Sequence, residues 1–121
     1  MKKIALLIVE DDSAQANLLY EILSQDYEVV DVCLNGIDAL KKIKCNTYNL
    51  IIIDLGMPAM SGKELIKKLR TKHCQTPILV YSGRIEENED FLSVSNLYYL
   101  QKPQTSYSLR AAIEAILSHS G

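Results

Sequence analysis

Short apolar runs alternate with stretches of helical period along the whole chain. The runs are rich in isoleucine, leucine and valine, and polar residues or turn signals stop each of them. This pattern is typical of strands that are buried on both faces of a sheet. Strands are expected at residues 4–9, 27–33, 50–53, 77–82 and 97–101. The second run mixes polar and β-branched residues, which favours a place at the edge of the sheet.

Each expected strand is followed by residues with helical spacing of apolar side chains. Helices are expected at 13–25, from Gly36 through Ile43, at 62–73, over a short stretch within 84–96, and from Thr105 onward. Asp12 and Gln15 have the spacing of a capping box, which predicts a helix start at Asp12. Thr105 is the expected N-cap of the last helix.

Five strands that each precede a helix predict an α/β fold with a parallel five-stranded sheet between two layers of helices. Because such crossovers are right-handed, the chain is expected to form a doubly wound (βα)5 three-layer sandwich with strand order 2-1-3-4-5. A length of 121 residues suits one domain, 1–121, with a single core.

Composition narrows the classes of function further. The formal net charge of −2 argues against broad electrostatic binding to nucleic acid, and no apolar run is long enough to cross a bilayer. The three cysteines are scattered without CxxC spacing, which argues against a disulfide framework and a zinc site. A cytoplasmic protein with reduced thiols is the expectation. The basic residues of the third helix are interpreted as a solvated face.

Polar residues gather where the expected strands end. Glu10 and Asp11 follow the first strand, Asp54 follows the third, Ser82 ends the fourth, and Lys102 follows the fifth. Ligands of such sheets bind outside the carboxyl ends of the strands. Strands one and three are expected to be neighbours about 4.8 Å apart, so Asp54 is expected beside the Glu10–Asp11 pair.

Three carboxylates this close repel one another, by about 4 kcal/mol for a pair at 4 Å and an effective dielectric near 20. Either one of them takes up a proton or a cation fills the gap. Ligands that offer only oxygen select a hard cation, Mg²⁺ above all, which commonly shares its coordination with phosphate oxygens. Lys102 and Ser82 would add a positive charge and a hydroxyl suited to a phosphoryl group beside Asp54.

With these residues in place, the sequence resembles the receiver domain of two-component response regulators over essentially its whole length. The signature is spread over four strand ends that read IVEDD, DLGMPAMSG, VYSG and YLQKP in order. The resemblance implies a flavodoxin-like fold and a signalling role in a phosphorelay. It also implies that the domain is not an enzyme beyond catalysing its own phosphorylation and dephosphorylation.

The resemblance implies a role for each site residue. Asp54 would accept a phosphoryl group from a phosphohistidine of a histidine kinase or a phosphotransfer domain. Asp11 would bind Mg²⁺ directly, Glu10 through water, and Gly56 through its carbonyl oxygen. Lys102 would neutralise the phosphoryl charge, and the bond from Lys102 to Pro103 would be cis.

The resemblance also implies a switch. Ser82 would move to the phosphoryl oxygen, Tyr99 would turn inward, and the face made by the fourth helix, fifth strand and fifth helix would change shape. A downstream protein or an attached output domain would read that face, without direct nucleic-acid or membrane binding by this domain. Gly56 and Arg84 occupy the positions that tune dephosphorylation in the family.

Three alternatives stay open at this stage. A Mg²⁺-dependent phosphatase of the haloacid-dehalogenase type also uses an aspartyl phosphate, but it typically needs a second Asp where this chain has Gly56. A nucleotide-binding domain would need a glycine-rich phosphate loop after the first strand, which is not there. A docking domain of the same fold would act without phosphorylation. The kinase, the target, and whether the receiver stands alone or belongs to a longer protein cannot be read from these residues.

Overall fold

The structure is a computed structural model that describes residues 2–57, 59–83 and 95–120. Its strands are β1 (Lys2–Val9), β2 (Tyr27–Cys33), β3 (Leu50–Ile53), β4 (Ile78–Ser82) and β5 (Leu97–Gln101). Its helices are α1 (Ser13–Leu23), α2 (Gly36–Cys45), α3 (Gly62–Thr71) and α5 (Ser106–Ser120). The short helix predicted within 84–96 falls almost entirely outside the described residues.

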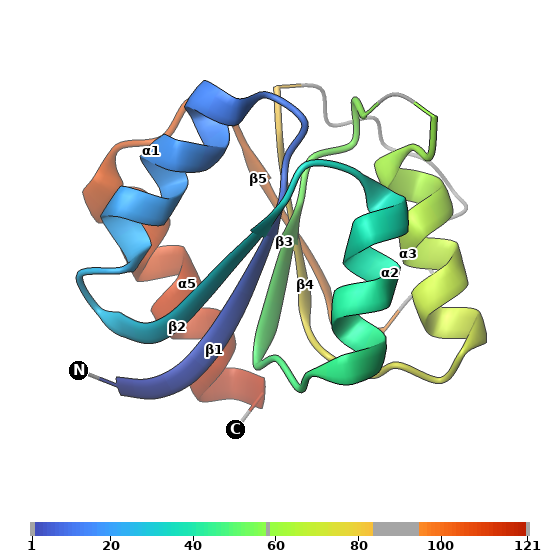
Figure 1. The fold of residues 1–121 in the computed structure, drawn as a ribbon. Coiled ribbons are helices and arrows are strands. Elements are labelled where there is room, and N and C mark those ends of the chain that lie inside the picture. Colours follow the sequence, from blue (N-terminus) through green and yellow to red (C-terminus); the bar gives the residue numbers. More distant parts are fainter. Residues whose placement is uncertain (1, 58, 84–94, 121) are drawn as a thin grey trace.

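All neighbouring strands pair in parallel, and the sheet has the order β2-β1-β3-β4-β5. The predicted fold class and strand order are therefore confirmed, including the edge position of β2. Figure 1 shows α1 and α5 on one face of the sheet and α2 and α3 on the other. The loops after β1 and β3 meet at the same end of the sheet, opposite the two chain termini.

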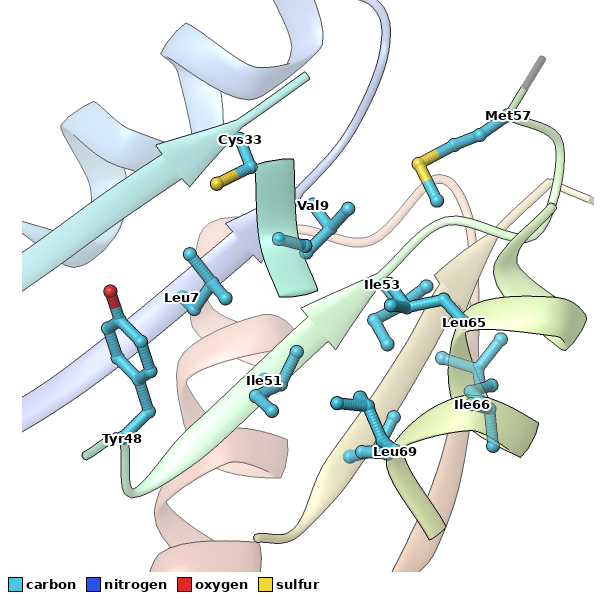
Figure 2. Close-up of a cluster of buried hydrophobic side chains, with 13 residues drawn as sticks. Leu7, Val9, Cys33, Tyr48, Ile51, Ile53, Met57, Leu65, Ile66 and Leu69 are labelled. Carbon is cyan, nitrogen blue, oxygen red and sulfur yellow. The ribbon is translucent and has the colours of Figure 1, made fainter. Parts of the chain in front are cut away.

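Side chains of the strands alternate between two hydrophobic clusters, one on each face of the sheet. On the face covered by α2 and α3, Ile51 and Ile53 pack with Leu65 and Leu69 of α3 (Figure 2). On the other face, Ile52 belongs to a cluster that includes buried residues of α1 and α5. Because both faces are covered, the central strands are apolar over most of their length, and the polar residues lie at their ends.

Two of the predicted helix starts are confirmed by their caps. The side chain of Asp12 accepts from the backbone N–H groups of Ala14 and Gln15, and the hydroxyl of Thr105 accepts from the N–H of Ser108. The helix predicted to reach His73 ends earlier, at Thr71, and His73 itself has a left-handed φ of 62°. No helix in the described part of the chain is long and apolar enough to span a membrane.

Candidate functional site

Backbone hydrogen bonds extend the sheet ladder by one residue at the carboxyl edge and so place the polar side chains. The N–H of Glu10 donates to the last residue of β2 at 3.0 Å, and the N–H of Asp54 donates to the last residue of β1 at 3.1 Å. The N–H of Lys102 donates to the last residue of β4 at 2.9 Å. The three residues are thus fixed to the sheet although they follow its strands.

The three predicted acids do come together. Carboxylate oxygens of Glu10, Asp11 and Asp54 lie within 4.8 Å of one another. Glu10 is buried, Asp54 is half-buried and Asp11 is exposed, so the cluster opens to solvent on one side. A close set of oxygen donors without histidine or cysteine fits a hard divalent cation, and Mg²⁺ in particular.

Lys102, which directly follows β5, reaches this cluster with its side chain. Its ammonium contacts Oε1 of Glu10 and lies 3.7 Å from Oδ2 of Asp54. The same ammonium lies 5.4 Å from the centre of the Tyr81 ring, which forms a wall beneath it. Lys102 is followed by a cis bond to Pro103.

Glu10 and Asp54 differ in their electrostatic surroundings. Burial raises the pKa of Glu10, and the charge of Asp54 adds to that effect, while Lys102 opposes it. Burial alone would also raise the pKa of Asp54, but hydrogen bonding from Ser82 and the charge of Lys102 outweigh burial and lower it. The backbone N–H of Gly56 also points at Oδ1 of Asp54, at 3.4 Å. Asp54 is therefore the carboxylate that the site keeps ionised.

A cavity of about 460 Å³ opens beside Asp54. Besides Asp54 and Leu55, its walls are formed by Gly56, Ser61, Lys63, Ser82 and Gly83. The wall at Gly56 is open, because a Cβ there would meet no atom within 4 Å. The cavity gives space beside the carboxylate for a group of the size of a phosphate.

Gly62 brings the start of α3 up to this cavity. A Cβ on Gly62 would lie 2.6 Å from the carbonyl oxygen of Asp54 and 2.7 Å from Cα of Leu55. The N–H of Gly62 donates to the carbonyl of Leu55 at 3.2 Å. Only a glycine allows the two backbones to approach so closely. Gly62 is therefore needed for packing at the site.

Other predicted residues lie apart from the acids or outside the described part of the chain. Tyr99 lies on β5 opposite Val80, with 39% of its surface exposed. Arg84 falls outside the described residues.

A groove of about 290 Å³ runs beside Lys102 between α1 and α5, and Leu18, at 59% exposure, is among its lining residues.

Sequence reasoning missed the roles of three residues. Gln15 accepts a hydrogen bond from Lys102 at 2.6 Å, Tyr81 lies under the same ammonium, and Lys63 lines the cavity. Lys63 is half-buried and does not fit the solvated face assigned to the basic residues of α3. The position of Lys63 at the start of α3, next to the strand ends, could have indicated that it lies near the site.

The sequence matches the family model of the response regulator receiver domain over residues 6–114. The chain therefore belongs to the receiver domain family of response regulators. Receiver domains normally bind Mg²⁺ through acidic residues, and this chain has an acidic cluster of Glu10, Asp11 and Asp54.

Similar proteins include complete regulators as well as a kinase. The chain is 33% identical to the regulatory protein VanRB of Enterococcus faecalis, over 98% of this chain and 54% of that protein. It is 37% identical to the sensor histidine kinase TmoS of Ectopseudomonas mendocina, over 93% of this chain and 12% of that protein. The chain thus spans about half the length of regulators such as VanRB, and a much smaller part of the kinase.

Solved structures agree with the fold. The response regulator protein TrrA of Thermotoga maritima, solved in complex with Mg²⁺ and BeF, superposes with a TM-score of 0.75 and 27% identity. The alignment covers 96% of this chain and 99% of TrrA.

Proposed function

We propose that the chain, residues 1–121, acts as a phosphorelay receiver that takes a phosphoryl group from a phosphohistidine onto Asp54. The observation that carries this proposal is the surroundings of Asp54. The carboxylate of Asp54 has a lysine ammonium at 3.7 Å and lines an open cavity of about 460 Å³. A nucleophile that stays ionised, a cation beside it and free space in front of it are the requirements of phosphoryl transfer.

The transfer itself needs little covalent chemistry from the protein. A carboxylate oxygen of Asp54 attacks phosphorus, the bond from phosphorus to the imidazole nitrogen of the donor breaks, and its electron pair leaves with the imidazole. Lys102 stabilises the negative charge on the phosphoryl oxygens, and the hydroxyl of Ser82 supplies a hydrogen bond. The product is an acyl phosphate on Asp54.

Glu10, Asp11 and Asp54, with the carbonyl of Gly56, are the residues that would hold Mg²⁺. When bound, Mg²⁺ neutralises part of the charge that the phosphoryl group adds to the acidic cluster. TrrA was solved with Mg²⁺ and BeF, which supports the assignment of the metal in this chain. The oxygen-only donor set supports it independently.

The donor is a histidine kinase or a histidine phosphotransfer protein. The groove between α1 and α5 supports an approach from this side, because Gln15 and Lys102 line it and lie next to the acidic cluster. Exposed Leu18 gives the groove an apolar rim for a protein partner.

The output is a change at Ser82 and Tyr99. Ser82 is buried beside Asp54, and its hydrogen bond to that carboxylate ties the end of β4 to the state of the site. Tyr99, on the neighbouring strand, is exposed and would turn inward. The face that includes β5 and α5 would then present a new shape to a downstream protein or an attached output domain. The cytoplasmic location expected from the sequence stays a prediction.

Hydrolysis of phosphate esters by the alternative phosphatase mechanism is less well supported. That mechanism needs a general acid close to the nucleophile, and the residue two positions after Asp54 is Gly56, whose Cβ position faces open space. The acids, hydroxyl and lysine are also all present around Asp54, which argues against a docking domain that works without phosphorylation.

The experiment is incubation of the protein with Mg²⁺ and a small-molecule phosphodonor, followed by intact mass measurement. We expect a gain of one phosphoryl group in the parent protein and none in Asp54→Asn, which keeps the shape of the side chain but removes the nucleophile. The same preparation should not turn over a generic phosphate ester. Equal phosphorylation of both proteins, or of neither, would contradict the proposal.

A further inference from the structure

The start of α1 departs from the capping box that its sequence predicts. In a capping box the side chain of Gln15 would return to the backbone N–H of Asp12. That N–H instead donates to Oε2 of Glu10 at 3.3 Å. The side chain of Gln15 is therefore released from the cap and turns toward the strand ends, where its oxygen meets Lys102.

Both ends of the Gln15 amide have a partner, which fixes its orientation. Its nitrogen donates to Oδ2 of Asp12 at 3.4 Å, and its oxygen accepts from the Lys102 ammonium at 2.6 Å. The opposite orientation would set the amide nitrogen against an ammonium, which has no acceptor. A leucine could make neither bond, and a glutamate would repel the Asp12 carboxylate. Glutamine is the side chain that suits this place.

We propose that Gln15 is a positioning residue that holds the Lys102 ammonium beside Asp54, a role that rests on the proposed function. An ammonium has three N–H donors. Glu10 and Gln15 engage it on the α1 side, and it lies 3.7 Å from Asp54, too far for a hydrogen bond to the carboxylate itself. Within the described residues, one donor thus remains for the phosphoryl oxygens that the reaction brings to Asp54.

The hydrogen bond from Lys102 to Gln15 differs in kind from the ion pair of Lys102 with Glu10. Gln15 is neutral, so it orients the lysine without cancelling its positive charge. It also lies outside the cluster of Glu10, Asp11 and Asp54, so its bond does not depend on what that cluster binds. Lysine has a long flexible side chain. If its ammonium is already fixed before the reaction, the entropic cost of ordering that side chain does not add to the activation barrier.

The test compares Gln15→Leu with Asn17→Leu, a matched change at an exposed position on the same helix. The rate of phosphorylation by a small-molecule phosphodonor with Mg²⁺ should fall about fivefold in Gln15→Leu, the scale of one solvent-accessible hydrogen bond. Asn17→Leu should keep the parent rate. In a Lys102→Met background, Gln15→Leu should cause no further loss, because the residue acts only through the lysine.

A second readout does not depend on phosphorylation. In protein labelled with ¹⁵N-lysine, the Lys102 ammonium protons should exchange with water faster in Gln15→Leu than in the parent and in Asn17→Leu. A parent protein that takes up no phosphoryl group would overturn the proposed function and this role with it. A parent that is phosphorylated at the same rate as Gln15→Leu would overturn the role of Gln15 alone. An equal loss from Gln15→Leu in the Lys102→Met background would do the same.

Discussion

The two sides of Asp54 are built in different ways. On the α1 side, Glu10, Gln15 and Lys102 form a continuous set of hydrogen bonds and ion pairs around one ammonium. On the α3 side, the carboxylate faces a cavity of about 460 Å³ whose nearest wall, at Gly56, carries no side chain. We refer to these as the α1 half and the α3 half of the site.

The difference separates two requirements of the proposed chemistry. Charges that must be in place before reaction belong to the α1 half, where strand ends and the start of a helix fix them. Space for the incoming group belongs to the α3 half, where glycines keep the backbone bare.

The largest effect is expected from adding a methyl group where α3 meets the site. Gly62→Ala would place its Cβ 2.6 Å from the Asp54 carbonyl oxygen, so either α3 or the loop that carries Asp54 must move. We expect the free energy of unfolding to fall by about 2 kcal/mol, as for other overpacked positions, when measured by urea denaturation.

Gly56→Ala is the matched control for that change, because its Cβ would meet no atom within 4 Å. Its free energy of unfolding should stay within about 0.5 kcal/mol of the parent. Equal losses from the two alanines would show that glycine flexibility, and not the close approach of two backbones, decides stability in the α3 half.

The fold was open to prediction from sequence because its signals repeat. Apolar runs, helical spacing and turn residues recur five times, and a parallel sheet covered on both faces is the arrangement that satisfies them all. The strand ends then place Glu10, Asp54 and Lys102 at one edge without further information. The family resemblance added roles to residues that topology had already gathered.

The sequence did not predict which partners the side chains of Gln15 and Lys63 would meet, because this depends on the direction in which each side chain points. Asp12 and Gln15 have the spacing of a capping box, yet the Asp12 N–H is taken by Glu10, so the glutamine is used elsewhere. Nothing local to the helix contains that information, because Lys102 is 87 residues away in the chain. Lys63 was similarly hidden among the other basic residues of its helix. Long-range competition for one donor or acceptor is invisible to patterns of spacing.

Magnesium should stabilise the protein through the acids that link the two halves. At a Mg²⁺ concentration ten times its dissociation constant, the free energy of unfolding should rise by about 1.4 kcal/mol. Asp11→Asn should lose most of this gain, since it removes one member of the cluster. Because Asp11 is exposed, the same change should have little effect on stability without Mg²⁺. The gain is measured by thermal unfolding with and without Mg²⁺. A gain in Asp11→Asn as large as in the parent would exclude the cluster as the metal site.

The smallest effect concerns the pH dependence of stability in the α1 half. Burial, more than any other cause, raises the pKa of Glu10 above its ordinary value of 4.5. The folded state therefore binds this proton more tightly than the unfolded state, and stability is lost as pH rises from 4.5 through the folded pKa. The pKa of Asp54 is shifted the other way, so its contribution is lost only as pH falls below its ordinary range near 3.8.

Glu10→Gln isolates the contribution of Glu10, because glutamine has no proton to lose. With Mg²⁺ removed by a chelator, the difference in free energy of unfolding between Glu10→Gln and the parent should shift in favour of the variant as pH rises from 4.5 to 7.5. The change with pH is the relevant quantity, because glutamine has one acceptor oxygen where Glu10 offers two, one to the Asp12 N–H and one to Lys102. Glu21→Gln, at an exposed position of α1, is the matched control and should show no such shift. A difference that does not change with pH would contradict this prediction. It would mean that the charge of Lys102 fully offsets the cost of burying an ionised Glu10 without a metal ion or a phosphoryl group.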